Sequence, residues 1–214
     1  LQHLNLEQNN ISNINALAVL TELEYFYISN NSVSDLSALA NMDELRGFSA
    51  NSNQVVDLSP LAALTDLEEL WLSENNITSI ESLALLDELR YLGIQNNEIT
   101  SMNALAGLND LEHFDAGSNP LSNGIDFLAG LTDLRNLSLY DLDIEELDPL
   151  ANLDKLESLN FSDNRVSDLG PLASCSALRD LNGWSNRVES LGSLSVLNLY
   201  SIYMGDNDID DISG

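Results

Sequence analysis

The side chains best suited to catalysis or metal binding are few and lie far apart. The chain has two histidines, His3 and His113, and one cysteine, Cys175. A lone cysteine can form neither an internal disulfide nor a cysteine-built zinc site. No Ser/His/Asp arrangement suggests itself, and no glycine-rich phosphate loop leads from a strand into a helix. We therefore expect no catalytic residues, no metal ligands and no enzymatic activity.

A group of aspartates near residue 210 raises the question of calcium binding. Asp206, Asp208, Asp210 and Asp211 lie close together, and hard cations bind clustered carboxylates. The downstream glycine and the bidentate glutamate of a calcium loop are absent at the required spacing. A solvated acidic loop is the favoured interpretation, calcium is kept as the alternative, and no other cofactor is expected.

The composition limits the class of partner. The 214 residues include 35 acidic and 7 basic side chains, which gives a net charge of −28. Nucleic acid and anionic membrane surfaces both need a basic face, so neither is an expected partner. A hydrophobic content of 44% argues against disorder. No apolar run approaches the roughly 20 residues of a membrane span, so no membrane insertion is expected.

An internal repeat provides the elements that would position these residues. With Leu20 as position 1, Leu23, Phe26, Ile28 and Asn31 occupy positions 4, 7, 9 and 12, and the frame recurs from Leu64, Leu86 and Leu153. Position 12 is asparagine in every unit but the seventh, where it is Leu142; these asparagines, the asparagine ladder, are Asn9, Asn31, Asn53, Asn75, Asn97, Asn119, Asn164, Asn186 and Asn207. With Leu142 included, consecutive position-12 residues are 21 to 23 residues apart, which predicts about ten similar coils.

Each unit has a direct physical interpretation. The alternation at positions 7 and 9 predicts a strand, and the asparagine amide can bond backbone groups left unpaired where the chain turns. The remaining ten residues are too few for an α-helix and two turns, so we expect extended or 3₁₀ structure there. Because one coil cannot bury its apolar stripe alone, the coils must stack into a repeat solenoid with a parallel sheet.

The segment from Val56 to Ile80, VDLSPLAALTDLEELWLSENNITSI, resembles the leucine-rich repeats of the 22-residue bacterial type found in internalin-like surface proteins. The resemblance covers essentially the whole chain. It implies a curved solenoid whose concave sheet binds another macromolecule and whose convex side carries the extended or 3₁₀ segments. We expect one solenoid over residues 1–214, truncated at both ends, with caps and flanking domains absent.

Positions 5, 6, 8 and 10 should face outward from the sheet, and all tyrosines and tryptophans fall on them, whereas four of the five phenylalanines fall on inward positions 7 or 9. Amphipathic aromatic residues are enriched at binding hot spots, although β-propensity alone also places aromatics on sheets. The predicted ligand-binding residues of the concave face are Tyr25, Tyr27, Trp71, Tyr91, His113, Tyr140, Trp184 and Tyr203. Among these, Tyr25, Tyr27, Trp71 and Tyr91 are expected to form one contiguous patch.

Position 5 alternates in charge over eight consecutive coils. This charge ladder consists of Glu24, Arg46, Glu68, Arg90, Glu112, Arg135, Glu157 and Arg179. Neighbouring parallel strands lie about 4.8 Å apart, so each arginine should contact two carboxylates. The ladder is interpreted as structural, because it relieves repulsion in a chain with excess acid.

Coils six and seven depart from the repeat. Coil six has an extra residue near Asn123 and Gly124, and coil seven has Leu142 between two aspartates. A local change in curvature or a small protrusion is expected there.

The sequence thus predicts a non-enzymatic recognition module that binds a protein, or a glycan, through an aromatic and acidic concave face. The resemblance implies that it belongs to a larger secreted or cell-surface bacterial protein, with an extracellular location. Two alternatives remain: a structural spacer in a surface protein, and an intracellular scaffold resembling the phosphatase-regulating repeat proteins of eukaryotes. The L-S-P-L-A motif and the single lysine, Lys155, argue against the intracellular scaffold.

Overall fold

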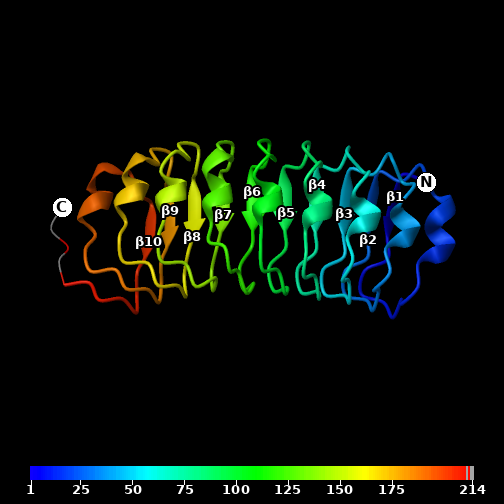
Figure 1. Ribbon diagram of the computed structural model, residues 1–214, viewed down its shortest axis with the longest axis horizontal. Coiled ribbons are helices and arrows are strands. Elements are labelled where there is room, and N and C mark those ends of the chain that lie inside the picture. The colour runs from blue at the N-terminus through cyan, green and yellow to red at the C-terminus, as the bar shows by residue number, and fades with distance from the viewer. Residues whose placement is uncertain (211, 213–214) are drawn as a thin grey trace.

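The computed structural model describes residues 1–210 and 212, and its main feature is one parallel sheet of ten strands in the order β1 to β10 (Figure 1). Each strand has three residues at positions 6 to 8 of its coil. The strands are β1 (His3–Asn5), β2 (Tyr25–Tyr27), β3 (Gly47–Ser49), β4 (Glu69–Trp71), β5 (Tyr91–Gly93), β6 (His113–Asp115), β7 (Asn136–Ser138), β8 (Ser158–Asn160), β9 (Asp180–Asn182) and β10 (Ser201–Tyr203).

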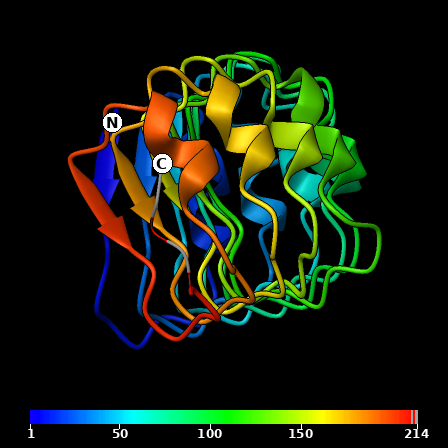
Figure 2. The same cartoon turned by 90° about the vertical axis from the view of Figure 1, so that its left-hand side faces the viewer.

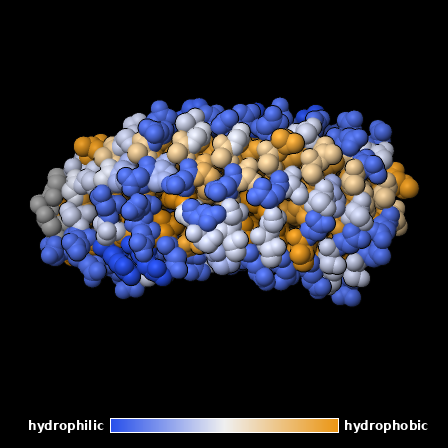
Figure 3. Space-filling model, in the orientation of Figure 1, coloured by the Kyte–Doolittle hydropathy of each residue, from blue (hydrophilic) through white to orange (hydrophobic). Residues whose placement is uncertain are grey.

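Short 3₁₀ helices return the chain between consecutive strands, on the side of the solenoid away from the sheet (Figure 2). The helices are η1 (Asn15–Val19), η2 (Ser37–Leu39), η3 (Ser59–Leu61), η4 (Glu81–Leu83), η5 (Asn103–Leu105), η6 (Asp126–Gly130), η7 (Asp148–Leu150), η8 (Gly170–Ser174) and η9 (Gly192–Val196). The predicted repeat solenoid, its parallel sheet and its 3₁₀ return segments are confirmed. Figure 3 shows that the helical side is largely hydrophilic, with apolar residues visible between the polar ones.

Strand register follows the repeat, because residues at the same position pair across neighbouring strands, as Leu70 does with Leu92. The inward positions form one continuous core along the solenoid. Large and small core residues complement one another: a Cβ on Gly183 would lie 2.3 Å from Cζ of Phe161 in the preceding coil. Gly183 therefore leaves the space that its larger neighbour occupies.

Every coil turns at position 11 through a left-handed residue that is not glycine. The φ angle is +52° at Ser52, +56° at Glu74 and +56° at Asn96, and the same position is left-handed in all ten coils. Short polar side chains tolerate this conformation best, and asparagine, aspartate or serine occupies position 11 in most coils. The turn directs the next residue, the ladder asparagine, into the coil.

The asparagine ladder connects the backbone of neighbouring coils. In coil four, Nδ2 of Asn75 donates to the carbonyls of Leu72 and Ser73 in its own coil, at 3.0 and 3.1 Å, and to Ala50 in the coil before, at 2.9 Å. Its Oδ1 accepts from the N–H of Val55 at 2.9 Å. The same bonds recur at the other ladder positions from Asn31 to Asn207, whereas Asn9 bonds, among the described residues, only to Leu6 and Glu7.

The ladder is interrupted between coils six and seven. Leu142 is buried at position 12, and the residues on either side of it, Asp141 and Asp143, are both left-handed. Two adjoining hollows of about 350 and 320 Å³ open here, and both are lined by Leu121, Leu142 and Asp143. The irregular sequence of these coils therefore produces a cleft in the loop side of the solenoid.

Candidate ligand-binding face

The outer face of the sheet is formed by positions 6 and 8 of each strand and by part of position 10. The prediction that position 10 faces outward is wrong in several coils, because Ser29, Ser73 and Ser162 are buried there. Ser29 shares a hydrogen bond with the Ser49 hydroxyl at 2.7 Å, so these short side chains tie neighbouring coils together. Tyr140 and Trp184, whose side chains are too large to fit inside, project outward from the same position.

The sheet face carries acidic side chains but no permanently positive ones. Positions 6, 8 and 10 of the ten coils hold no lysine or arginine, and their only acidic residues are Glu7, Glu69, Asp115 and Asp180. Most of the remaining outward residues are tyrosine, tryptophan, serine, asparagine and glycine. The aromatic residues thus lie on a surface where acidic side chains are scattered and no lysine or arginine occurs.

Five rings of this face, two of them histidines, contact one another in two groups. His3 stacks on Tyr25 with ring centroids 4.9 Å apart. In the second group, Tyr91 lies 6.4 Å from Trp71 and stacks on His113 at 4.5 Å. Within residues 1–210, no ring contact joins the two groups, so the prediction of one contiguous patch that includes Tyr25, Tyr27, Trp71 and Tyr91 is wrong. Strand β3, with Gly47 and Ser49 outward, separates them.

Four rings lie across a glycine of the neighbouring strand or turn. A Cβ on Gly47 would come within 2.6 Å of the Tyr25 ring, and a Cβ on Gly93 within 2.6 Å of the Trp71 ring. Tyr140 covers Gly117 and Trp184 covers Gly205 in the same way, with approaches of 2.1 and 2.3 Å. Each glycine occupies the same repeat position as the ring that covers it. The glycines allow the rings to lie against the sheet, which fixes their orientation.

The rings towards the C-terminal end of the sheet are more exposed. Trp184 and Tyr203 are 52% and 61% exposed, whereas Tyr25, Tyr27, Trp71, Tyr91, His113 and Tyr140 are partly buried. The hydroxyl of Tyr140 accepts a hydrogen bond from Asn96 at 3.2 Å. Tyr200 takes the place of a glutamate at position 5 and lies 5.9 Å from the guanidinium of Arg179, within the range of a cation–π contact.

A shallow hollow of about 240 Å³ lies beside the second aromatic group. It extends from Trp71 and His113 on one side to Ser158 and Asn160 on the other, and Asp115 lies between them. Short side chains at positions 6 and 8 of β7 and β8, such as Ser138 and Ser158, create the space. Sequence reasoning missed this hollow, although the small outward side chains of β7 and β8 are visible in the repeat alignment.

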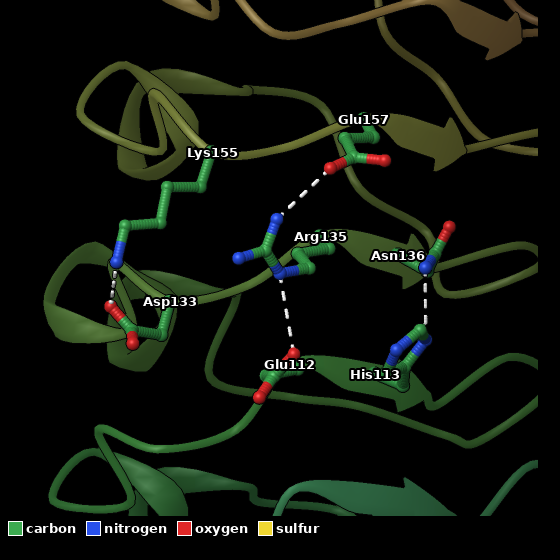
Figure 4. A network of polar contacts seen from close by, with 7 residues as sticks. All are labelled: Glu112, His113, Asp133, Arg135, Asn136, Lys155 and Glu157. Atoms are coloured by element: carbon green, nitrogen blue, oxygen red, sulfur yellow. Dashed lines mark hydrogen bonds and ion pairs between the residues drawn. The ribbon is translucent and has the colours of Figure 1, made fainter.

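The charge ladder is continuous around Arg135 (Figure 4) and interrupted elsewhere. Arg135 bridges Glu112 and Glu157 at 3.2 and 3.0 Å, and Arg46 contacts Glu68 at 2.8 Å. In the part of the chain that the structure describes, Arg90 forms no ion pair, and Arg179 donates instead to the carbonyls of Ser176 and Leu178. The predicted continuous line of contacts is therefore wrong at these two arginines and around Glu24, which accepts from Gln2. Exposed pairs gain little, so long side chains readily choose other partners.

Three titratable groups are perturbed by burial. Burial raises the pKa of the Asp115 carboxyl, although hydrogen bonds from Gly117 and Ser138 act against the rise. Burial, together with the negative charge of Glu69, raises the pKa of Tyr27. Burial raises the pKa of the Cys175 thiol to about 11, so it is neutral and unreactive at physiological pH.

The part of the chain that the structure describes contains no cluster of potential metal ligands. Residues 1–210 and 212 contain no group of three or more histidine, cysteine, aspartate or glutamate side chains arranged to hold a metal ion. The calcium alternative involves Asp211, which lies outside the described residues. None of the described helices is long and apolar enough to cross a membrane.

Comparisons with known proteins agree with this geometry. The family described as "Leucine Rich repeats (2 copies)" matches residues 1–41 and 43–85. An internalin of Listeria monocytogenes, InlF, shares 29% identity, with a TM-score of 0.80, over 97% of this chain and 68% of that one. Internalin C2 of the same species shares 27% identity, with a TM-score of 0.70, over 94% of this chain and 80% of that one.

A more distant structure shares the fold alone. The leucine-rich repeat ectodomain of an Arabidopsis thaliana membrane receptor kinase, solved in complex with Casparian strip integrity factor 2, is 23% identical, with a TM-score of 0.83. That similarity covers 96% of this chain and 27% of the ectodomain. A comparison with curated proteins gives no significant match.

Proposed function

We propose that this internalin-like leucine-rich repeat protein is a non-enzymatic recognition module that binds a protein through the outer face of its sheet, the concave face in this family. The proposal includes an extracellular or cell-surface location, which the similarity to internalins supports. The residues proposed to contact the partner are Tyr25, Tyr27, Trp71, Tyr91, His113, Tyr140, Trp184 and Tyr203.

The observation that carries the proposal is the composition of the sheet face. This face holds no lysine or arginine and is rich in tyrosine, tryptophan, serine, asparagine and glycine. The same residues dominate antibody paratopes, where rigid aromatic rings provide contact area and short polar groups provide adaptable hydrogen bonds.

The glycine contacts add a second argument. Binding orders flexible side chains at an entropic cost of about 0.5–1.5 kcal/mol for each one that is immobilised. Rings that pack over Gly47, Gly93, Gly117 and Gly205 have less conformational freedom to lose when a partner binds. Aromatic rings held in this way on the outer face of the sheet therefore favour recognition of a partner. The same packing over glycine also stabilises the sheet itself.

The test is a binding screen against an array of purified extracellular proteins, read by biolayer interferometry. Any protein that binds is measured again with the variant Tyr27→Ser and with Trp184→Ala. The matched controls are Val19→Ser and Leu85→Ser, because these apolar residues are 81% and 73% exposed away from the strands. The proposal expects the two sheet-face variants to lose at least tenfold in affinity and the controls to keep the wild-type value. Equal losses, or no partner on the array, would contradict it.

A further inference from the structure

The hollow beside Trp71 combines an aromatic wall with a polar one. Its volume is about 240 Å³, which is enough for one small ring-shaped group but not for a helix or a strand. Gly93 contributes no side chain here, and Ser138 and Ser158 contribute short ones. The floor is thus the sheet itself, and the walls are aromatic on one side and polar on the other.

Trp71 provides a preset apolar platform. Its Cε3 lies 2.6 Å from the position of a Cβ on Gly93, so one face of the indole rests on the next strand. The tilted ring of Tyr91 supports it from the side at 6.4 Å, and the stack of Tyr91 on His113 continues the wall at 4.5 Å. The negative face of an aromatic ring attracts the weakly positive C–H groups of a ligand that stacks on it.

The polar wall has unused hydrogen-bonding capacity. Oδ1 of Asn160 accepts from the N–H of Ser162 at 3.1 Å, whereas its Nδ2 makes no hydrogen bond within residues 1–210. Asn136 uses Nδ2 on Nδ1 of His113 at 2.9 Å and leaves its Oδ1 free there (Figure 4). The Ser158 hydroxyl, which both donates and accepts, is likewise unused in that range. Donors and acceptors therefore alternate along one side of the hollow.

The electrostatics of the hollow favour a neutral ligand. Asp115 is its one charged side chain, and this carboxylate already accepts from the N–H of Gly117 at 3.2 Å. Neither lysine nor arginine lines the hollow, so an anionic group would find no permanent positive charge there. A lysine or arginine of a partner would meet a single carboxylate that is already hydrogen-bonded.

We propose that this hollow is a carbohydrate subsite that takes one neutral pyranose ring, stacked on Trp71 and hydrogen-bonded by Asn136, Ser158 and Asn160. A pyranose offers an apolar C–H face and a rim of hydroxyl groups, each of which donates and accepts. Few other neutral ligands combine these two features in a ring of this size. The inference rests on the proposed function, because it assigns one ligand chemistry to part of the same face.

The experiment uses the Trp184→Phe variant, in which Trp71 is the one remaining tryptophan of the chain. Its fluorescence is titrated with methyl glycosides and linear trisaccharides of glucose, galactose, mannose and N-acetylglucosamine. The expected result is a saturable change with at least one of these series, with a Kd of about 1 mM or tighter. No saturable change with any series up to about 50 mM would overturn the proposal.

A matched pair of variants tests the polar wall. Asn160→Ala should weaken saccharide binding about tenfold. Asn182→Ala should not, because Asn182 occupies the same position in the next strand and accepts from Trp184 N–H at 3.2 Å but lies outside the hollow. Circular dichroism melts establish that both variants are folded. Equal losses of binding would overturn the assignment.

A third experiment asks whether the sugar belongs to a glycan on a protein or to a free oligosaccharide. It also separates the sugar subsite from the proposed function of protein binding. A protein that binds the sheet face is tested before and after enzymatic deglycosylation, and in competition with the best free saccharide. Loss on deglycosylation assigns the ring to a glycan on the protein; saccharide binding without such a loss assigns it to free oligosaccharide. A protein that binds the face although no saccharide binds would overturn the sugar subsite and leave the proposed function intact.

Discussion

The two stripes of repeated side chains that flank the strands behave differently. The asparagine ladder at position 12 makes the same backbone bonds in coil after coil and is interrupted only at Leu142 within residues 1–210. The charge ladder at position 5 repeats as regularly in sequence, yet Arg46 and Arg135 are the arginines that contact its glutamates in that range.

Side-chain length and burial account for the difference. Asn75 is 8% exposed, has two side-chain torsions and is surrounded by backbone groups that have few other partners. Arg90 is long and exposed, and water competes for both of its ladder partners. A regular sequence pattern therefore specifies a regular contact only where burial removes the alternatives.

The largest expected effect comes from breaking the asparagine ladder in its regular region. Asn75→Ala leaves the N–H of Val55 without a partner and removes one bond from the carbonyls of Ala50, Leu72 and Ser73. We expect a loss of about 3 kcal/mol, or a fall in Tm of about 10 °C for a chain of this size. Thermal melts followed by circular dichroism measure it.

Asn9→Ala is the matched control for that variant. Among the described residues, Asn9 bonds only to Leu6 and Glu7, and it is exposed, so its replacement should lower Tm by no more than about 2 °C. Equal falls for Asn9→Ala and Asn75→Ala would mean that the asparagines act through local turn propensity and not through inter-coil bonds.

A second prediction concerns the interruption of the asparagine ladder. Leu142→Asn restores the consensus residue, but the N–H of Leu121, from which the new side-chain oxygen would accept, already donates to the carbonyl of Asn119 at 2.8 Å. The variant gains few bonds and loses a buried leucine side chain, which should lower stability by about 2 kcal/mol. Chemical denaturation measures this, with Leu142→Ala as the control. A variant more stable than wild type would show that the ladder rule holds in every coil.

The sequence could predict whatever a single repeat position determines. The coil spacing gave the strand register, the inward apolar positions gave the core, and the short return segment excluded α-helices. Contacts between different coils were harder to predict, because the glycine under Trp71 is visible only when Gly93 is aligned at the same position of the next unit. The partner of Arg90 could not be predicted, since exposed pairs differ too little in energy.

Salt should change the Tm through the charges of the chain and not through the asparagine ladder. The asparagine ladder carries no charge, whereas a net charge of −28 makes the folded solenoid repel itself. Raising sodium chloride from about 10 mM to 1 M shortens the Debye length from about 30 to 3 Å, so Tm should rise by a few degrees. Asn75→Ala should show the same rise from a lower starting value. A Tm that stays flat or falls with salt would mean that ion pairs outweigh the repulsion.

The smallest effect, and the most direct test of the charge ladder, comes from Arg135→Gln and Arg90→Gln. Both arginines lie at position 5 between two glutamates, and both substitutions change the net charge by the same amount. Arg135 contacts both neighbours, at 3.2 and 3.0 Å, whereas no contact of Arg90 with its neighbours is present within residues 1–210. At about 10 mM salt we expect Arg135→Gln to lower Tm by about 2 °C more than Arg90→Gln does, and at 1 M the difference should vanish because screening removes the pairs. Since the net charge is matched, the difference between the two variants isolates the contacts from the field of the whole chain. Equal falls in Tm would mean that the alternating charges act through that field and that the contacts of Arg135 add nothing measurable.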